Sequence, residues 1–409
     1  MKNILGYRCT VCGKEFDYTE LMTCPVCGEK GILDIVFDYN EIKKTFSKES
    51  LKNDRNNSMW RYSALMPLEQ RDFSKFLRVG WTPLYSSNSL GNELGIKKLY
   101  IKDDGINPTA SLKDRASGVA VAKALELGYD TISCSSTGNA ASSCAGNAAR
   151  MGLKTVIFVP ERAPEGKVAQ LMIFGAKVVS VKGDYKQTFD LSKAAIERFG
   201  WYNRNAGINP ILTEGKKTVS LEIAEQLGFE PTDWVAVSVG DGCTIGGVYN
   251  GFYDLYKLGM IDRIPKILGV QSSGCCPFVT AAKNDAELVP CEENTLADSI
   301  AVGVPRNPRK ALRAVRDSNG AWLAVSDEDI LEAMRVLGRT EGVFGEPAGV
   351  TATAGVINAV KQGIIKSDET VTVISTGSGL KDVRNALKAA GTPNKCEPDI
   401  NALIASGIL

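Results

Sequence analysis

Residues 131–181 read TISCSSTGNAASSCAGNAARMGLKTVIFVPERAPEGKVAQLMIFGAKVVSV. Within this stretch, apolar β-prone runs at 131–136, 155–160 and 177–181 alternate with helical stretches at 139–151 and 164–175. Strand-like runs that alternate with helical runs of this length are typical of an open, mostly parallel α/β sheet. We therefore predict an α/β fold built around this stretch.

The same rhythm extends over most of the remaining chain. Further strands are predicted at 99–101, 234–239, 267–271 and 371–375. Helices are predicted between or beside them, at 111–127, 216–227, 245–258, 327–341 and 347–361. The polar and charged residues 37–78 precede this pattern, and we interpret them as a linking segment without chemistry of its own. A chain of 409 residues is long enough for two or three domains.

Polar segments follow several of the predicted strands. They are residues 103–115, 135–139, 240–244 and 375–379. In open α/β sheets, ligands bind outside the carboxyl ends of the strands. One such segment would be an ordinary turn, but four of them favour a shared polar crevice. The sequence therefore predicts a ligand site at this edge.

The chain contains no histidine. This excludes Ser-His-Asp and Cys-His nucleophile systems and every zinc site that needs imidazole. Proton transfer in an enzyme would then fall to Lys, Asp, Glu, Tyr, Cys or a cofactor. The 48 Lys and Arg residues nearly cancel the 47 Asp and Glu residues, so no global basic field attracts nucleic acid or membrane. Because no run approaches the roughly 18 apolar residues of a membrane helix, we expect a cytoplasmic protein without nucleic-acid or membrane partners.

Four of the eleven cysteines form two Cys-x-x-Cys-Gly motifs, Cys9 with Cys12 and Cys24 with Cys27. In each motif the glycine lets backbone N–H groups turn toward thiolate sulfur. Four thiolates leave no open position on a tetrahedral ion, so we predict structural zinc within residues 1–36, with rubredoxin-like iron or free thiols as alternatives. The remaining cysteines are expected to be reduced and packed inside the protein: Cys134, Cys144, Cys243, Cys275, Cys276, Cys291 and Cys396.

The turn Gly240-Asp241-Gly242-Cys243-Thr244 joins a predicted strand to a predicted helix. Backbone N–H groups and the helix dipole at such a turn attract an anion. The turn lacks the Gly-Lys-Ser/Thr ending of a Walker loop and the spacing of a dinucleotide motif. We therefore predict that it binds the phosphate of a modest-sized cofactor, with a bare turn as the alternative.

Lys113 lies in the stretch Asn-Pro-Thr-Ala-Ser-Leu-Lys-Asp-Arg at residues 107–115. It stands near a predicted helix N-terminus and close to Arg115, and positive potential of this kind favours the neutral, nucleophilic amine. Most lysines are exposed surface residues. The phosphate turn, the Ser/Thr/Asn loop and the absence of histidine nevertheless favour a catalytic Lys113.

These segments resemble those of the fold type II, or tryptophan-synthase-β-like, pyridoxal-phosphate enzymes, and within them the threonine synthase family. The resemblance covers roughly residues 75–390 and rests on motifs in the same order. They are Gly80-Trp81-Thr82-Pro83-Leu84, the 107–115 stretch, Ser136-Thr137-Gly138-Asn139, Glu346-Pro347-Ala348-Gly349 and Thr376-Gly377-Ser378-Gly379-Leu380-Lys381-Asp382.

The resemblance implies two open, mostly parallel α/β domains after the zinc-ribbon-like N-terminus. Residues 105–200 would form a small mobile domain. Residues 37–104 and 201–409 would form a large domain, with pyridoxal 5′-phosphate between the two. Closure of the small domain would exclude water from the reaction. A homodimer is also implied.

The resemblance further implies roles for single residues. Lys113 would bind the cofactor covalently and then act as the base at the substrate carbons. Residues 240–244 would bind the cofactor phosphate, Asn139 its 3′-oxygen, and Thr376 would face the pyridine nitrogen. Because a hydroxyl does not protonate this nitrogen, Thr376 would favour elimination and replacement over transamination. The α-carboxylate of an amino-acid substrate would be held by Ser136, Thr137 and Gly138.

The stretch from Asn205 to Thr218 departs from the family pattern. Threonine synthases carry an arginine that helps to seat the substrate phosphate where this chain has Leu212. Other residues of this region could donate hydrogen bonds to the substrate phosphate instead, or they could be solvated loop residues. They are Arg204, Asn205, Thr213 and Lys216. Three further residues are open to interpretation. Arg115 is another candidate anion ligand or has a structural role, Ala110 replaces a family glycine, and Glu346 would lie near the cofactor ring or merely begin a helix.

Two enzymatic functions follow from the resemblance. The first is conversion of O-phospho-L-homoserine to L-threonine, by γ-elimination of phosphate and addition of water at the β-carbon. Because of Leu212, the alternative is β-replacement or β-elimination on a serine-type amino acid, as in cysteate synthase with O-phosphoserine and sulfite, or in threonine and serine dehydratases. A binding protein with a vestigial lyase body is disfavoured, because Lys113, Asn139 and Thr376 are all present.

Overall fold

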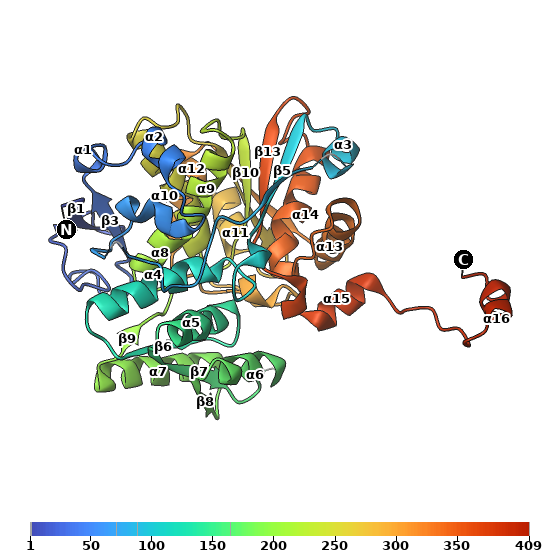
Figure 1. Ribbon diagram of the computed structural model, residues 1–409, viewed down its shortest axis with the longest axis horizontal. Coiled ribbons are helices and arrows are strands. Elements are labelled where there is room, and N and C mark those ends of the chain that lie inside the picture. Colours follow the sequence, from blue (N-terminus) through green and yellow to red (C-terminus); the bar gives the residue numbers. More distant parts are fainter. Residues whose placement is uncertain (1, 71, 88, 164, 409) are drawn as a thin grey trace.

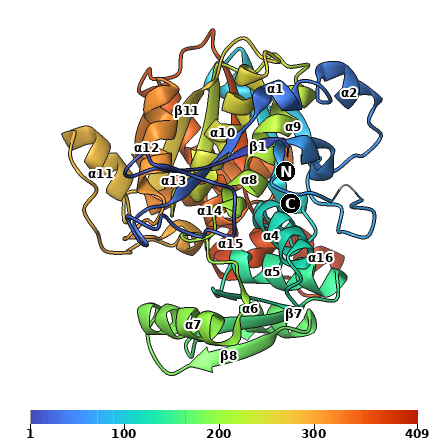
Figure 2. The same cartoon turned by 90° about the vertical axis from the view of Figure 1, so that its left-hand side faces the viewer.

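The chain folds into two α/β units and a small N-terminal sheet (Figure 1). The computed structural model describes residues 2–70, 72–87, 89–163 and 165–408. Figure 1 and the perpendicular view in Figure 2 both show a smaller unit, which contains the strand β8 (Lys177–Val181), below the larger one. The predicted α/β class with mostly parallel sheets is confirmed.

The larger unit is built on a six-stranded sheet of order β12-β11-β10-β13-β5-β4. Only β4 runs antiparallel to its neighbour. Its strands are β4 (Leu84–Ser87), β5 (Lys98–Asp103), β10 (Trp234–Ser238), β11 (Lys266–Ser272), β12 (Ala321–Val325) and β13 (Thr370–Ser375). Every residue of β10 is buried, because helices cover both faces, and this explains its continuous run of mostly apolar residues.

Helices cover the two faces of this sheet. On one face, α14 (Pro347–Lys361) packs against β10, β11 and β13, and α13 (Asp327–Glu341) packs outside it. On the other face, α10 (Cys243–Lys257) and α12 (Pro308–Asp317) contact the sheet. The remaining helices of this unit are α3 (Ser89–Leu94), α8 (Ile211–Lys216), α9 (Thr218–Gln226), α11 (Pro277–Asn284) and α15 (Val383–Ala390). Helix α16 (Ile400–Ala405) follows an extended segment and lies apart from the body in Figure 1.

The smaller unit has a parallel sheet of order β8-β7-β6-β9. Its other strands are β6 (Thr131–Ser135), β7 (Lys154–Pro160) and β9 (Tyr202–Asn203), and its helices are α5 (Asn139–Arg150), α6 (Glu165–Ile173) and α7 (Tyr185–Phe199). Helix α4 (Lys113–Glu126) packs against both α5 and α8 and thereby connects the two units. Strand β9 lies beyond residue 200, where the sequence places the limit of the small domain.

The N-terminal module is an antiparallel sheet of β1 (Ile4–Cys9), β2 (Glu15–Phe16) and β3 (Leu33–Phe37), in the order β2-β1-β3. It is bonded to both α/β units. Lys310 of α12 donates to the Leu33 carbonyl over 2.8 Å, and the Tyr129 hydroxyl donates to Glu20 over 3.3 Å. The module therefore lies against the body as a third structural part.

Residues 37–78 are not a mere linking segment. They form α1 (Tyr39–Ile42), α2 (Lys48–Asn53) and a 3-10 helix at Met59–Leu65. Trp60 stacks on Phe73 with ring centroids 4.3 Å apart, and Arg61 pairs with Glu225 of α9 over 2.6 Å. Although this segment is rich in charged residues, its aromatic residues Trp60 and Phe73 belong to the hydrophobic core.

Most predicted elements are present with shifted ends. The helix predicted at 216–227 is two helices, α8 and α9, and the helix predicted at 111–127 begins at Lys113. Pro164, the predicted start of the helix at 164–175, lies outside the described residues. Packing inside the protein is confirmed for Cys134, Cys144, Cys243 and Cys275, but it is wrong for Cys291 and Cys396, which are exposed.

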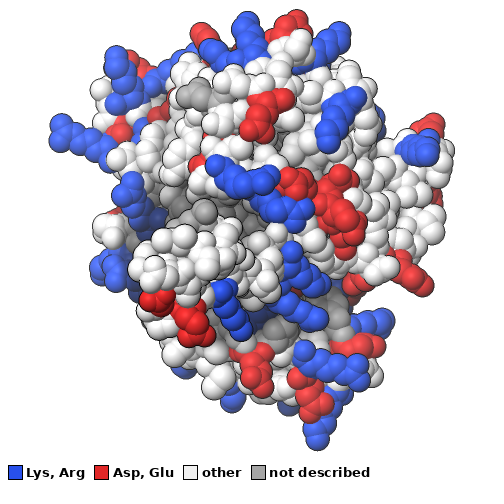
Figure 3. All heavy atoms as spheres, turned by 90° about the vertical axis from the view of Figure 1, so that its right-hand side faces the viewer, with Lys and Arg blue, Asp and Glu red and all other residues white. Residues whose placement is uncertain are grey.

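Surface charge is mixed. On the face in Figure 3, Lys and Arg side chains are interspersed with Asp and Glu side chains. Within the described part of the chain, no helix has both the length and the apolar character to cross a membrane.

Candidate functional site

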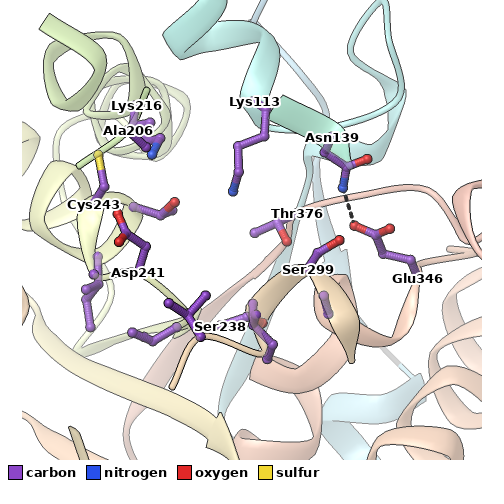
Figure 4. A pocket seen from close by; sticks show the side chains of 18 residues that line it. Lys113, Asn139, Ala206, Lys216, Ser238, Asp241, Cys243, Ser299, Glu346 and Thr376 are labelled. Atoms are coloured by element: carbon purple, nitrogen blue, oxygen red, sulfur yellow. Dashed lines mark hydrogen bonds between the residues drawn. The ribbon is translucent and has the colours of Figure 1, made fainter. Parts of the chain in front are cut away.

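A polar pocket opens where the carboxyl ends of the strands lead into their helices. Its empty space measures about 660 Å³, part of it open to solvent. Figure 4 shows Lys113, Asn139, Glu346 and Thr376 around it. The predicted site residues that line it are Lys113, Asn139, Lys216, Gly240, Asp241, Gly242, Cys243, Thr244 and Thr376.

Lys113 is the first residue of α4, and its side chain points into the pocket (Figure 4). Burial lowers its pKa to about 8, and the positive charges of Lys216 and Arg204 act in the same direction. At pH 7 about one-tenth of the amine is therefore neutral and nucleophilic. The turn before it includes Ala110 at φ 64°, a left-handed conformation that glycine adopts more easily, and this explains the family glycine there.

Arg115 is not an anion ligand, contrary to one expectation. Its side chain is fully buried and already paired: Nε lies 2.6 Å from Asp104, and Nη1 lies 2.5 Å from Glu222. Glu222 also pairs with the buried Lys102 over 2.8 Å. Arg115 therefore fixes α4 in the fold, and it leaves Lys113 to face the pocket.

The turn at 240–244 presents the N-terminus of α10 to the pocket. Gly242 precedes the helix at φ 89°, and no side chain caps it. The first N–H groups of a helix have no partner within the helix, so they can bind an anion such as a phosphate. The Asp241 carboxylate is occupied by other hydrogen bonds, because it accepts from the Arg306 backbone N–H and from Asn307 Nδ2. This donor set fits the phosphate of pyridoxal phosphate.

Asn139 and Glu346 form a buried pair at the opposite side of the pocket. Asn139 Nδ2 donates to Glu346 Oε1 over 2.6 Å (Figure 4). Burial raises the pKa of Glu346 to about 7, with a contribution from Asp298, so this carboxyl is half protonated near neutral pH. Although Glu346 precedes α14, its side chain makes no cap bond to that helix, so its contacts are those of a pocket residue.

Thr376 follows β13 and is held by its backbone. Its carbonyl accepts from the Leu112 N–H over 2.8 Å, and its own N–H donates to the Gly349 carbonyl over 3.3 Å. These bonds join the segments of three predicted motifs at one place. The motifs converge as expected from their positions after the strands.

The predicted carboxylate loop lies at the edge of the site. Ser136, Thr137 and Gly138 are half-buried in the turn between β6 and α5. The Gly138 N–H donates to Ser136 Oγ over 3.2 Å. None of the three belongs to the pocket lining itself, which begins at Asn139, so their role toward a substrate stays a prediction.

The altered stretch after β9 is buried rather than solvated. Leu212 belongs to the hydrophobic core. The solvated-loop alternative is wrong, because the four candidate donors are almost fully buried: Arg204, Asn205, Thr213 and Lys216. Lys216 lines the pocket directly. Sequence reasoning also left out Ser238 and Ser299, which line the pocket without belonging to a recognisable motif.

The four N-terminal cysteines form one cluster. The Sγ atoms of Cys9, Cys12, Cys24 and Cys27 all lie within 4.8 Å of one another. Both motif glycines have positive φ, 70° at Gly13 and 61° at Gly28. The Cys12 and Cys24 sulfurs are 3.8 Å apart, which matches the roughly 3.8 Å between thiolates on a tetrahedral ion with bonds of about 2.3 Å. The donor set thus fits a closed tetrahedral metal site.

Comparisons with known proteins agree with this geometry. The family described as "Pyridoxal-phosphate dependent enzyme" matches residues 75–377. The threonine synthase of Methanocaldococcus jannaschii is 41% identical over 97% of this chain and 98% of its own length. That of Methanosarcina acetivorans is 40% identical over 97% of each chain. In fold, the diaminopropionate ammonia lyase of Escherichia coli matches with a TM-score of 0.68 at 21% identity, covering 84% of this chain and 92% of its own.

The matched region contains the whole pocket, and the relatives span nearly the whole chain. The chain therefore belongs to the threonine synthase family of fold type II pyridoxal-phosphate-dependent enzymes and is a lyase of this kind.

Proposed function

We propose that this protein converts O-phospho-L-homoserine and water to L-threonine and inorganic phosphate. The observation that carries this proposal is the convergence of Lys113, Asn139, Thr376 and the 240–244 turn on one pocket, in a chain that aligns over 97% of its length with a threonine synthase. Pyridoxal phosphate, when bound, supplies an electron sink for the reacting substrate carbons.

The residues of the pocket divide the work by their position. Lys113 Nζ would hold the cofactor and would later accept and return protons at the substrate carbons, for which an amine with a pKa of about 8 is suited. The N-terminus of α10 would hold the cofactor phosphate. Thr376 would face the pyridine nitrogen, and Asn139, oriented by Glu346, would bind the 3′-oxygen.

The amino-acid part of the substrate would bind on the side of the smaller unit. Ser136, Thr137 and Gly138 lie at the N-terminus of α5, where N–H groups and hydroxyls can receive an α-carboxylate. The smaller unit would close over the substrate and exclude water until the hydration step. The division at residues 105–200 is part of this proposal.

Product identification tests the proposed reaction. We expect the holoenzyme to release phosphate from O-phospho-L-homoserine and to form L-threonine, whereas Lys113→Ala should do neither. Parallel reactions use O-phospho-L-serine with and without sulfite, and L-serine or L-threonine alone. Formation of cysteate or of a 2-oxo acid, without turnover of phosphohomoserine, would assign the β-replacement or β-elimination reaction and reject the proposal.

We also propose that Cys9, Cys12, Cys24 and Cys27 hold one structural zinc ion. We expect about one zinc per chain in the purified protein and loss of this zinc in Cys12→Ser. Iron in its place, or wild-type protein without metal, would contradict this proposal. The homodimer and the cytoplasmic location stay predictions.

A further inference from the structure

Two buried cations have no carboxylate partner: Lys216 lines the pocket, and Arg204 stands two residues before the lining residue Ala206. Arg204 is 1% exposed and Lys216 is 2% exposed. Among the residues that the structure describes, no acidic side chain forms an ion pair with either of them. Burial of an unpaired charge is costly, because the charge loses water without gaining a counter-ion. Two such unpaired charges are therefore present, and a bound anion would compensate them.

Both cations lie close to Lys113. Arg204 Nε donates to Ser117 Oγ over 3.0 Å, and Ser117 is one helical turn after Lys113 on α4. Residues four apart on a helix share a face, so Arg204 lies along the face of α4 that carries Lys113. Lys216 is part of the pocket lining (Figure 4). Both charges act on the Lys113 amine and lower its pKa.

Unsatisfied polar atoms gather around Arg204. Buried atoms without a hydrogen-bond partner among the described residues include Arg204 Nη2, Asn205 Nδ2 and Ser135 Oγ. These residues are neighbours, since the Ser135 N–H donates to Asn205 Oδ1 over 3.0 Å. The next residue, Ala206, lines the pocket. Buried polar groups without hydrogen-bond partners are costly unless a ligand completes their bonds.

The acidic residues of the pocket do not balance these cations. Asp241 accepts from the Arg306 backbone and Asn307. Glu346 accepts from Asn139, and burial favours its neutral form. The cofactor phosphate has its own cradle at the N-terminus of α10, so the positive charge of Arg204 and Lys216 remains available for a second anion.

We propose that Arg204, together with Asn205 and Lys216, binds the phosphate of a phosphorylated amino-acid substrate, in place of the arginine that is absent at Leu212. This inference rests on the proposed function for the cofactor and deepens it for the substrate. Arg204 supplies a buried guanidinium, which matches phosphate through two parallel hydrogen bonds. O-Phospho-L-homoserine and O-phospho-L-serine share this chemistry, whereas unphosphorylated L-serine and L-threonine lack it.

The test compares Arg204→Met and Lys216→Met with Lys154→Met, an exposed lysine on β7 of the smaller unit. All measurements use the holoenzyme. The Michaelis constant is measured for whichever phosphorylated amino acid is turned over, and inhibition by inorganic phosphate is measured alongside. We expect Arg204→Met to raise both the Michaelis constant and the inhibition constant of phosphate by about 10- to 100-fold, as for loss of hydrogen bonds to a charged group. Lys154→Met should match the wild type, and Arg204→Lys should restore part of the affinity.

A change in the cofactor absorption band or in the melting temperature of Arg204→Met would reveal a structural effect. In that case the phosphate affinity of Arg204→Lys decides whether the positive charge binds phosphate. The proposal is overturned if Arg204→Met and Arg204→Lys both keep wild-type phosphate inhibition. It is also overturned if Arg204→Met weakens inhibition by L-serine as strongly as inhibition by phosphate, since Arg204 would then bind the α-carboxylate.

Failure of the proposed function has a different signature. In that case phosphohomoserine is not turned over, yet inhibition by phosphate, or turnover of O-phospho-L-serine, still depends on Arg204. Turnover of phosphohomoserine that is indifferent to Arg204 and Lys216 would leave the reaction in place and remove only the proposed phosphate site.

Discussion

Arg115 and Arg204 are both buried completely, but their surroundings are opposite. Arg115 lies between Asp104 and Glu222, at 2.6 and 2.5 Å, and Glu222 also contacts Lys102. Arg204 has one hydroxyl partner, Ser117, and a terminal nitrogen without a partner among the described residues. Arg115 is part of a complete network of ion pairs, whereas Arg204 keeps a donor nitrogen without a partner.

This difference separates the scaffold from the site. A paired buried charge fixes the geometry of its neighbours, and removal of one partner leaves an uncompensated ion. An unpaired buried charge gains its compensation when an anionic ligand binds. Arg115 therefore belongs to a rigid support of α4, and Arg204 belongs to the proposed anion-binding region near Lys113.

The largest effect is expected at Lys113, which lies between the two regions. Lys113→Ala should lower the turnover rate roughly 10³-fold or more, because this residue is both the cofactor attachment and the proton-transfer group. The protein should stay folded and lose the visible absorption band of bound cofactor. Phosphate release and absorbance spectra measure both. Activity that persists at one-tenth of the wild-type rate would place the chemistry elsewhere.

A large loss of stability is expected from the paired region. Glu222→Gln should lower the free energy of unfolding by about 3–5 kcal/mol, since the buried Lys102 loses its carboxylate partner and Arg115 keeps only Asp104. Urea unfolding of the holoenzyme measures the change. A loss below about 1 kcal/mol would mean that the network does not support α4, and the contrast with Arg204 would fail.

A moderate effect is expected on the pH dependence of cofactor capture. The neutral Lys113 amine is the reactive form, so the rate at which apoenzyme captures pyridoxal phosphate should rise with pH and level off above about pH 8. The positive charge of Lys216 lowers the pKa of Lys113, so Lys216→Met should move the midpoint upward, by up to about one pH unit. Stopped-flow absorbance gives the profile. An unchanged or lower midpoint would show that the charge of Lys216 does not lower the pKa of Lys113.

The smallest effect is expected on the stability of the unpaired region. Arg204→Met should leave the free energy of unfolding of the holoenzyme within about 1 kcal/mol of the wild type or raise it, because an apolar side chain removes an uncompensated charge. Arg115→Met is the matched variant and should be strongly destabilised. Equal losses for the two variants would show that Arg204 is paired in a way that resembles Arg115.

Local patterns predicted the sheets and the positions of the pocket residues. Strands such as β8 and the turn at 240–244 are visible in the sequence, because apolar runs and glycines report local backbone requirements. The rule that ligands bind at the carboxyl ends of the strands then brought Lys113, Asn139 and Thr376 together correctly.

Long-range pairing could not be read in the same way. Glu222 is 107 positions from Arg115, and Glu346 is 207 positions from Asn139, so no local pattern distinguishes a paired arginine from an unpaired one. The same reason explains why residues 37–78 looked like a linker: the partner of Arg61 is Glu225, far along the chain. Burial of Arg204 and Lys216 likewise depends on contacts that only the fold creates.

The most direct measurement is a crystal structure of the holoenzyme with a non-cleavable phosphonate analogue of O-phospho-L-homoserine. We expect phosphonate oxygens within about 3 Å of Arg204 and Lys216, with the α-carboxylate at residues 136–138 and Arg115 unchanged between Asp104 and Glu222. A phosphonate held by other residues, with Arg204 still lacking an anionic partner, would contradict this expectation.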